Sequence, residues 1–181
     1  MQKVKEQIIQ PTLVGLQKED ILYQGFIFFG LTNVGGNPYV IEYNCRMGDP
    51  ESEAVIPRIK TDLLQLLKAV KNQELSGKTI EFDPRHAASV FLVSGGYPDA
   101  YEKGKVISGI ENISESIVFH AGTKMLDDDI VTSGGRVLAI TSLAQTMQDA
   151  LSKSYQNAKL VDFDKKNFRK DLGRDLLEYS S

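Results

Sequence analysis

Hydrophobic and polar positions alternate along residues 39–46. One set is Tyr39, Ile41, Tyr43 and Cys45, and the other is Val40, Glu42, Asn44 and Arg46. Successive side chains of a strand point to opposite faces, with same-face neighbours roughly 7 Å apart. The pattern therefore predicts a strand whose first set faces the core and whose second set lines up a carboxylate, a carboxamide and a guanidinium.

The periodicity around this strand predicts the elements of the first part of the chain. They are a helix over residues 1–18 bent at Pro11, a buried strand over 21–33, a hairpin turn at 34–37, the return strand over 38–46, a short helix from Pro50 to near Pro57 with Asp49 as its N-cap, and an amphipathic helix over 61–72.

After residue 78 the pattern changes to short β segments separated by turns rich in glycine and aspartate. The segments are 88–93, 106–107, 116–124 and 136–142, followed by a helix over 143–159. Asp127–Asp129 is interpreted as a solvated hairpin tip, because no calcium-loop spacing completes it. The chain is thus predicted to be α+β, with domains at residues 1–78 and 79–181.

Composition and charge narrow the function classes. The net charge is −3 without a basic cluster, which argues against nucleic acid or an anionic membrane as a partner. The single cysteine is typical of a reducing, cytoplasmic environment, and no apolar stretch approaches a membrane span. The start of the chain reads as an amphipathic helix and not as a signal peptide. We therefore expect a soluble intracellular protein.

The polar strand face is the strongest candidate for chemistry. Carboxylate and carboxamide oxygens suit Mg²⁺, and an arginine beyond them suits a phosphoryl or carboxylate oxygen. Two ordinary structural interpretations remain open. Glu42 and Asn44 could form a solvated strand face, and Arg46 could pair with Asp49 or Glu51, which could themselves serve a helix start.

The run Glu42-x-Asn44-x-Arg46-x-Gly48-Asp49-Pro50-Glu51 resembles phosphoribosylamine–glycine ligase, an ATP-grasp enzyme family of purine biosynthesis. Further matching motifs follow in the family's order: Tyr23–Phe26, Gly30–Leu31, Ser94–Pro98, Val118–Thr123, Gly134–Leu138 and Phe168–Asp171. The resemblance covers nearly the whole chain but only the carboxy-terminal part of the family's sequence. It implies the end of an ATP-grasp domain followed by a small β-rich domain, a barrel–sandwich hybrid with one long helix.

The resemblance also implies roles for residues. Glu42 and Asn44 would bind Mg²⁺ (or Mn²⁺) that bridges ATP phosphates, and Arg46 would act catalytically on the acyl phosphate. Substrate contacts would come from two segments, the turn formed by Gly48, Asp49, Pro50 and Glu51, and the loop containing Gly96, Tyr97 and Pro98, which would face the phosphoribosylamine pocket.

The implied reaction joins glycine to 5-phosphoribosylamine with ATP, through glycyl phosphate, and yields glycinamide ribonucleotide, ADP and phosphate. The chain looks like a carboxy-terminal fragment that lacks the nucleotide flap and adenine hinge, so we expect it to need the missing amino-terminal half and to be inactive alone. Two alternatives stay open: another ATP-grasp carboxylate–amine ligase, or a non-catalytic carrier module in which Lys124-Met125 would be modified.

Overall fold

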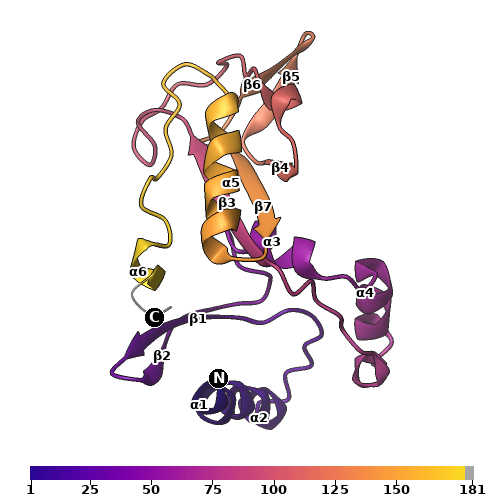
Figure 1. Ribbon diagram of the computed structural model, residues 1–181. Coiled ribbons are helices and arrows are strands. Elements are labelled where there is room, and N and C mark those ends of the chain that lie inside the picture. Colours follow the sequence, from indigo (N-terminus) through magenta and orange to yellow (C-terminus); the bar gives the residue numbers. More distant parts are fainter. Residues whose placement is uncertain (178–181) are drawn as a thin grey trace. The chain divides into compact units, whose positions relative to one another are not determined.

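Residues 1–177 are described by the computed structural model, which combines helices with antiparallel sheets in an α+β arrangement (Figure 1). The chain groups into two compact units. The first comprises residues 1–52 and 61–81, and the second comprises residues 53–60 and the chain from 82 onward. The division into domains at residue 78 stays a prediction. None of the helices within residues 1–177 is long and apolar enough to cross a membrane.

The first unit begins with the expected helix. It consists of α1 (Gln2–Val4), a π-helical turn (Lys5–Ile9) and α2 (Gln10–Lys18). Pro11 has no N–H to donate, and its ring crowds the carbonyl of the preceding turn. The wider π turn lies directly before the proline, where such a bulge relieves that crowding.

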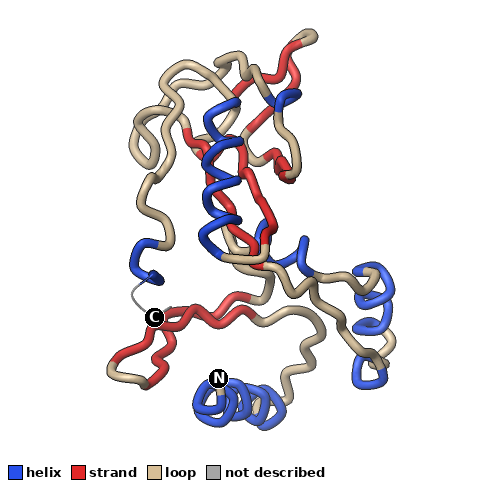
Figure 2. Tube along the Cα trace, in the orientation of Figure 1, coloured by secondary structure: helices blue, strands red, loops and turns tan. Residues whose placement is uncertain are grey.

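A β-hairpin follows, with β1 (Phe28–Val34) antiparallel to β2 (Asn37–Asn44) (Figure 2). Its turn is where the sequence predicts it, and Gly35 and Gly36 have φ values of 57° and 79°. Positive φ at both central positions is the requirement of the tight turn whose twist matches paired strands, and glycine meets it without strain.

The register of the hairpin contains a β-bulge. Gly30 pairs with Glu42, but Leu31 pairs with Val40, so Ile41 is an extra residue. Faces alternate with each pair, and the bulge therefore places Val40 on the face opposite Glu42 and Asn44. The prediction that Val40 shares their face is wrong because simple alternation does not allow for the inserted residue.

The apolar side of this hairpin is also more exposed than predicted. The side chain of Ile41 is 70% exposed and that of Tyr43 is 52% exposed, and β1 has no fully buried residue. The predicted buried strand over 21–33 begins only at Phe28. Both expectations fail for one reason: within the described residues this sheet has two strands, and two strands cannot bury their own faces.

Four short helices follow, of which the first two lie almost wholly in the second unit and the last two in the first. They are α3 (Ser52–Val55), a 3₁₀ turn (Ile56–Arg58), α4 (Leu63–Lys71) and a 3₁₀ turn (Leu75–Gly77). The Asp62 side chain caps α4 by accepting the N–H of Gln65 at 2.9 Å. The helix predicted from Pro50 with Asp49 as its N-cap starts at Ser52 instead, because residues 49–51 form a turn.

The second unit is built on a three-stranded antiparallel sheet in the order β3-β7-β4. Its elements are β3 (His86–Val93), β4 (Ser116–His120), the hairpin of β5 (Thr123–Leu126) and β6 (Asp129–Thr132), β7 (Arg136–Ala144), α5 (Met147–Leu160) and α6 (Arg174–Leu177), with a 3₁₀ turn at Ile110–Asn112. The barrel–sandwich topology stays a prediction.

Three predicted segments of this unit have different bounds. Residues 116–124 form two strands, residues 106–107 contribute only an isolated bridge from Val106 to Val131, and the helix predicted from Leu143 starts at Met147. The helix starts later because β7 continues to Ala144 and Thr146 caps α5, its hydroxyl accepting the N–H of Asp149 at 3.0 Å.

The core of the second unit lies between the sheet and α5. Val90, Leu92, Val137, Leu138, Ile140, Ala158 and Val161 are fully buried there. A chain of buried polar groups also joins helix to sheet. The Ser154 hydroxyl is 2.7 Å from the Ala88 carbonyl and 2.8 Å from Ser142 Oγ, which lies 2.6 Å from Ser116 Oγ. This unit is therefore held by apolar packing and by a connected hydroxyl network.

Candidate functional site

Glu42 and Asn44 lie on one face of the hairpin and contact each other. The Nδ2 atom of Asn44 donates a hydrogen bond to Oε1 of Glu42 at 2.9 Å. Gly30 is paired with Glu42 across the hairpin, and a Cβ at position 30 would lie 2.8 Å from Glu42 Cγ. The glycine therefore leaves the space in which the Glu42 side chain crosses the neighbouring strand.

The turn after β2 packs against the same face. Gly48 is buried, and a Cβ there would lie 2.7 Å from the ring of Phe28 and 2.5 Å from Oε2 of Glu51. Phe28 is the cross-strand partner of Asn44. The structure thus places Gly48 and Glu51 of the motif beside Phe28, the cross-strand partner of Asn44.

The turn is closed by hydrogen bonds to one carbonyl. The backbone N–H of Ser52 donates to the Gly48 carbonyl at 3.1 Å, and the Ser52 hydroxyl donates to the same oxygen at 2.6 Å. Residues 49–51, including Asp49 and Pro50, are held between these two ends.

Arg46 lies beyond the regular strand. β2 ends at Asn44, residues 45 and 46 form a bend, and Nη1 of Arg46 donates to the Met47 carbonyl at 2.9 Å. The prediction that Arg46 continues the strand face is wrong, because alternation stops where the strand stops. The Tyr23 hydroxyl holds this end in place by hydrogen bonds to the carbonyls of Phe26 and Cys45, at 2.7 and 3.1 Å.

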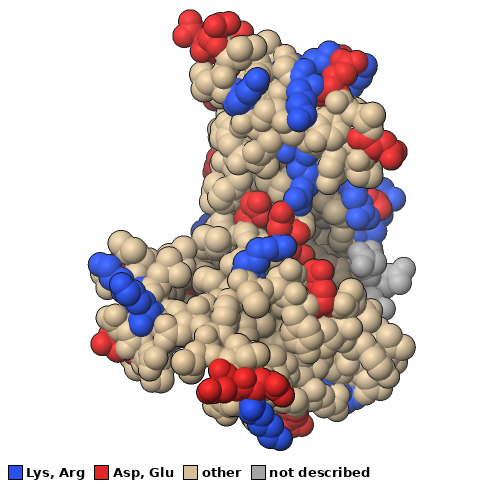
Figure 3. All heavy atoms as spheres, turned by 180° about the vertical axis from the view of Figure 1, so that it is seen from behind, with Lys and Arg blue, Asp and Glu red and all other residues tan. Residues whose placement is uncertain are grey.

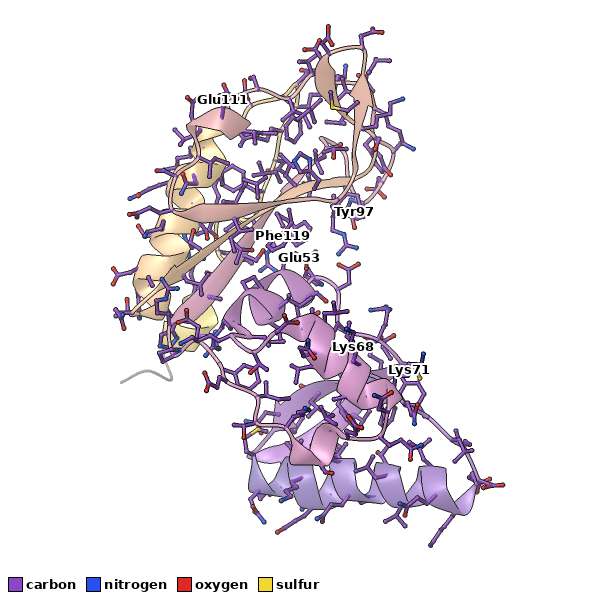
Figure 4. The ribbon with its side chains drawn as sticks, turned by 90° about the vertical axis from the view of Figure 1, so that its right-hand side faces the viewer. Glu53, Lys68, Lys71, Tyr97, Glu111 and Phe119 are labelled. Carbon is purple, nitrogen blue, oxygen red and sulfur yellow. The ribbon has the colours of Figure 1, made fainter. Side chains whose placement is uncertain are left out.

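The second predicted substrate segment, residues 95–98, is a tight loop in the second unit. The Ser94 N–H donates to the Gly135 carbonyl at 2.8 Å, and Gly96 has a φ of 97°, which favours glycine. The ring of Tyr97 (labelled in Figure 4) lies so close to Gly135 that a Cβ at position 135 would be 2.1 Å from it. The loop is thus held by contacts with Gly135 within the second unit. Its contact with substrate stays a prediction.

Some residues that shape the site were not singled out from the sequence as site residues. Gly30 and Phe28 form the surface behind Glu42 and Asn44, and Tyr23 fastens the end of β2. A glycine inside a predicted strand is one available signal, since it often marks a bulge or a close approach, and Tyr23 and Gly30 also stand in motifs shared with the family. The roles of Phe28 and Tyr23 depend on register, which local pattern does not reveal.

The donor set fits a magnesium ion that also binds a ligand's phosphates. Asn44 uses its nitrogen toward Glu42, so its carboxamide oxygen is not used in that bond. Within residues 1–177 no group of three or more His, Cys, Asp or Glu side chains could hold a metal. One carboxylate and one carboxamide match a Mg²⁺ site completed by phosphate oxygens and water, because this ion is seldom held by an all-protein cage.

Two features of the second unit bear on the predicted acidic hairpin tip and on the carrier-module alternative. Asp127 has a φ of 52° and lies in the turn between β5 and β6, as expected of a hairpin tip. Lys124 lies within β5 and pairs with Val131. A carrier lysine is required at the tip, so the geometry of Lys124 does not favour the carrier module.

Charged side chains are dispersed on the face shown in Figure 3. Lysine and arginine are interspersed with aspartate and glutamate, with wide areas of other residues between them. In the second unit several charged side chains form pairs, for example Lys153 with Glu115 at 2.7 Å and Lys105 with Glu102 and Asp164.

Two family models match the chain. Residues 1–52 match "Phosphoribosylglycinamide synthetase, ATP-grasp (A) domain", and residues 87–175 match "Phosphoribosylglycinamide synthetase, C domain". The fold and these two matches thus define the class, a protein with the end of an ATP-grasp domain followed by a carboxy-terminal domain of the same family. The chain belongs to the phosphoribosylamine–glycine ligase family and corresponds to its carboxy-terminal portion.

Individual relatives agree with this assignment. Phosphoribosylamine–glycine ligases of Fusobacterium nucleatum and Escherichia coli K12 are 40% and 43% identical over 176 residues, which is 95% of this chain and 41% of each relative. The crystal structure of phosphoribosylamine–glycine ligase from Thermotoga maritima matches 94% of this chain and 42% of its own, with a TM-score of 0.80 and 36% identity. The chain spans about two fifths of the length of these relatives.

Proposed function

We propose that the chain contributes to the ATP-dependent joining of glycine and 5-phosphoribosylamine, giving glycinamide ribonucleotide, ADP and phosphate. The observation that carries this proposal is the Glu42–Asn44 pair on one face of the bulged hairpin, within residues 1–52 that match the ATP-grasp model. Relatives that carry the ligase name support the choice of substrates.

Each site residue has a role in this proposal. Glu42 and Asn44 would hold Mg²⁺ (or Mn²⁺), which neutralises charge on the ATP phosphates when bound. The guanidinium of Arg46, held at the Met47 carbonyl, stabilises negative charge on glycyl phosphate. The turn from Gly48 to Glu51 contacts substrate, and the ribosylamine nitrogen attacks the glycyl carbonyl and displaces phosphate, so no side-chain nucleophile is required.

The Gly96–Tyr97–Pro98 loop completes the assignment. The Ser94 N–H that precedes it donates to the Gly135 carbonyl and the Tyr97 ring packs against Gly135, and we propose that the loop presents this edge to phosphoribosylamine. The remaining contacts to ATP are assigned to the amino-terminal portion of the ligase, the part of the relatives' length that this chain does not span.

The first test measures binding of Mn²⁺-ATP by electron paramagnetic resonance, with the 181-residue chain supplemented by the amino-terminal portion of a relative. We expect Glu42→Gln and Asn44→Ala to weaken the Mn²⁺ signal from bound ion about tenfold or more, since each removes a direct ligand. Glu81→Gln, an exposed glutamate of the same unit, is the matched control. Equal binding by all four proteins would exclude this metal site.

The second test measures turnover with Mg-ATP, glycine and phosphoribosylamine, with and without the separately prepared amino-terminal portion of a relative. Activity only after addition supports the proposal. If a different amino acid or amine is turned over instead, the alternative carboxylate–amine ligase takes its place. If no turnover is detected after the amino-terminal portion is added, with both parts folded, the proposed activity is excluded.

A further inference from the structure

Residues 94–104 form one loop of the second unit, which is anchored at both ends. At its start, the Ser94 hydroxyl donates a hydrogen bond to the Gly134 carbonyl at 2.9 Å. At its end, the Gly104 N–H donates to the Thr132 carbonyl at 2.7 Å. Both acceptors lie at the connection from β6 to β7, so the shape of the loop between its two ends depends on other contacts.

A second segment, residues 162–168, lies against the start of this loop. The Val93 N–H donates to the Asn167 carbonyl at 2.8 Å, and the Asn167 N–H donates to the Val93 carbonyl at 3.0 Å. A Cβ at Gly95 would lie 2.7 Å from the carbonyl oxygen of Lys165 and 2.5 Å from its Cβ. A glycine is therefore required at position 95, because the backbone of the 162–168 segment passes so close to it.

Four charged side chains connect the loop to the 162–168 segment. Lys165 Nζ donates to Oε1 of Glu102 at 3.2 Å, Glu102 also pairs with Lys105, and Lys105 lies 3.1 Å from Asp164. Hydrogen bonds from Lys105, and secondly from Lys165, lower the pKa of the Glu102 carboxyl. Exposed ion pairs add little to the stability of a fold, so the main consequence of this network is where it places Glu102.

The backbone of Lys165 has a conformation that lysine seldom adopts. Its φ is 59°, in the left-handed region where a Cβ is crowded and where glycine and asparagine are more readily accommodated. The backbone alone would thus favour one of those two residues. What the lysine side chain adds at this position is its contact with Glu102.

Glu102 is linked to Tyr97 through the neighbouring Tyr101. The rings of Tyr97 and Tyr101 meet edge to face, with their centroids 6.1 Å apart. The loop also folds back on itself, since a Cβ at Gly96 would lie 2.2 Å from the Ala100 carbonyl oxygen. A displacement of Glu102 is therefore passed to Tyr101 and from there to Tyr97.

We propose that Lys165 and Glu102 are positioning residues that hold the Gly96–Tyr97–Pro98 loop in the shape that binds phosphoribosylamine. This inference rests on the proposed function, in which that loop contacts phosphoribosylamine. The two residues act through the loop and touch no substrate themselves. Loss of their contact releases the loop while the core between α5 and the sheet stays intact.

The principal variant is Lys165→Asn, which removes the charge but suits the left-handed backbone. Lys165→Arg restores the charge and is the rescue variant. Glu115→Asn is the matched control, because Glu115 has a φ of 53° and an exposed ion pair with Lys153. It lies beside Ser116, which pairs with Ser142 toward the opposite end of β7 from the loop.

The first measurement does not depend on activity. Lys103 is an exposed residue of the loop, and mass spectrometry follows the rate at which trypsin cleaves the 181-residue chain after it. We expect Lys165→Asn to be cleaved about threefold faster or more, because cleavage requires the loop to open. Lys165→Arg and Glu115→Asn should be cleaved at the rate of the unmodified chain. Equal rates for Lys165→Asn and the unmodified chain would overturn the proposal.

The second measurement is steady-state turnover after addition of the amino-terminal portion of a relative. We expect Lys165→Asn and Glu102→Gln to raise the KM for phosphoribosylamine about threefold to fivefold, with kcat and the KM values for glycine and ATP unchanged. The double variant should match Glu102→Gln alone, because Lys165 has then already lost its partner.

The outcomes separate this inference from the proposed function. Faster cleavage with an unchanged KM for phosphoribosylamine would overturn the role in substrate binding and leave the proposed function in place. A network that only stabilises the fold predicts a lower urea midpoint and no selective change in that KM. Absence of turnover by the unmodified chain would remove the proposed function, and the cleavage rates would then decide alone whether Lys165 holds the loop.

Discussion

The carboxamide nitrogen of Asn44 donates to Oε1 of Glu42 at 2.9 Å, two positions away on the same strand. This bond fixes the orientation of the Asn44 carboxamide. Its oxygen and the Glu42 carboxylate are therefore neighbouring hydrogen-bond acceptors on one face of the strand. The bulge at Ile41 lies directly before Glu42 and changes which residues share this face. A bulge next to a site re-aims side chains, and here it separates the polar pair from Val40.

Gly30→Ala tests whether the space opposite Glu42 is needed. The added Cβ would lie 2.8 Å from Glu42 Cγ, so the Glu42 side chain has to shift from the position in which it meets Asn44. We expect Mn²⁺-ATP binding to weaken about tenfold while the hairpin still forms. Gly77→Ala, where a Cβ meets nothing within 4 Å, is the control. Unchanged metal binding in Gly30→Ala would show that the Glu42 position is not critical.

Gly135→Ala tests whether packing of the Tyr97 ring against Gly135 stabilises the fold. A Cβ at position 135 would lie 2.1 Å from the Tyr97 ring, which cannot be accommodated without moving the ring. We expect the free energy of unfolding to fall by about 1–3 kcal/mol, as in other overpacked sites. Urea denaturation followed by circular dichroism measures it. A stability equal to that of the unmodified chain would mean that the loop is mobile and not held against Gly135.

Ser154→Ala tests the hydroxyl network between α5 and the sheet. The substitution removes the hydroxyl that donates to the Ala88 carbonyl and contacts Ser142 Oγ, and leaves Ser142 with its contact to Ser116 Oγ. We expect a loss of about 1–3 kcal/mol in the free energy of unfolding. Ser152→Ala, exposed on the same helix, should change stability by less than about 0.5 kcal/mol. Similar effects of the two changes would contradict the network.

Asp83→Asn tests an acid-sensitive pair. Hydrogen bonds from Arg85 lower the pKa of the Asp83 carboxyl from 3.8 to about 2. A depressed pKa means that the folded state favours the ionised form, so the stabilisation is full above the ordinary pKa near 4 and is lost as the pH falls toward 2. We expect Asp83→Asn to lower stability at pH 7 and to flatten its decline between pH 4 and 2, measured by urea denaturation. Parallel pH profiles of both proteins would contradict the role of the pair.

The local parts of the fold could be predicted because they depend on neighbours in the chain. The hairpin turn at Gly35 and Gly36 follows from residues that accept positive φ, and the first helix follows from its apolar spacing. The strands at 86–93 and 136–144 likewise coincide with their apolar segments. The motif around Glu42 identified the family because it combines several uncommon residues at fixed spacing.

The sequence by itself therefore determined the family and the approximate place of most elements, and it predicted the residues that would carry the candidate chemistry. The tertiary structure alone decided which side chains meet: the bulge that moves Val40 off the face of Glu42, the approach of Gly30 to the glutamate, and the seating of Tyr97 on Gly135. It also decided that Ile41 is exposed. The physical reason is that burial and register depend on what packs against a strand, and that partner can lie anywhere along the chain or outside it.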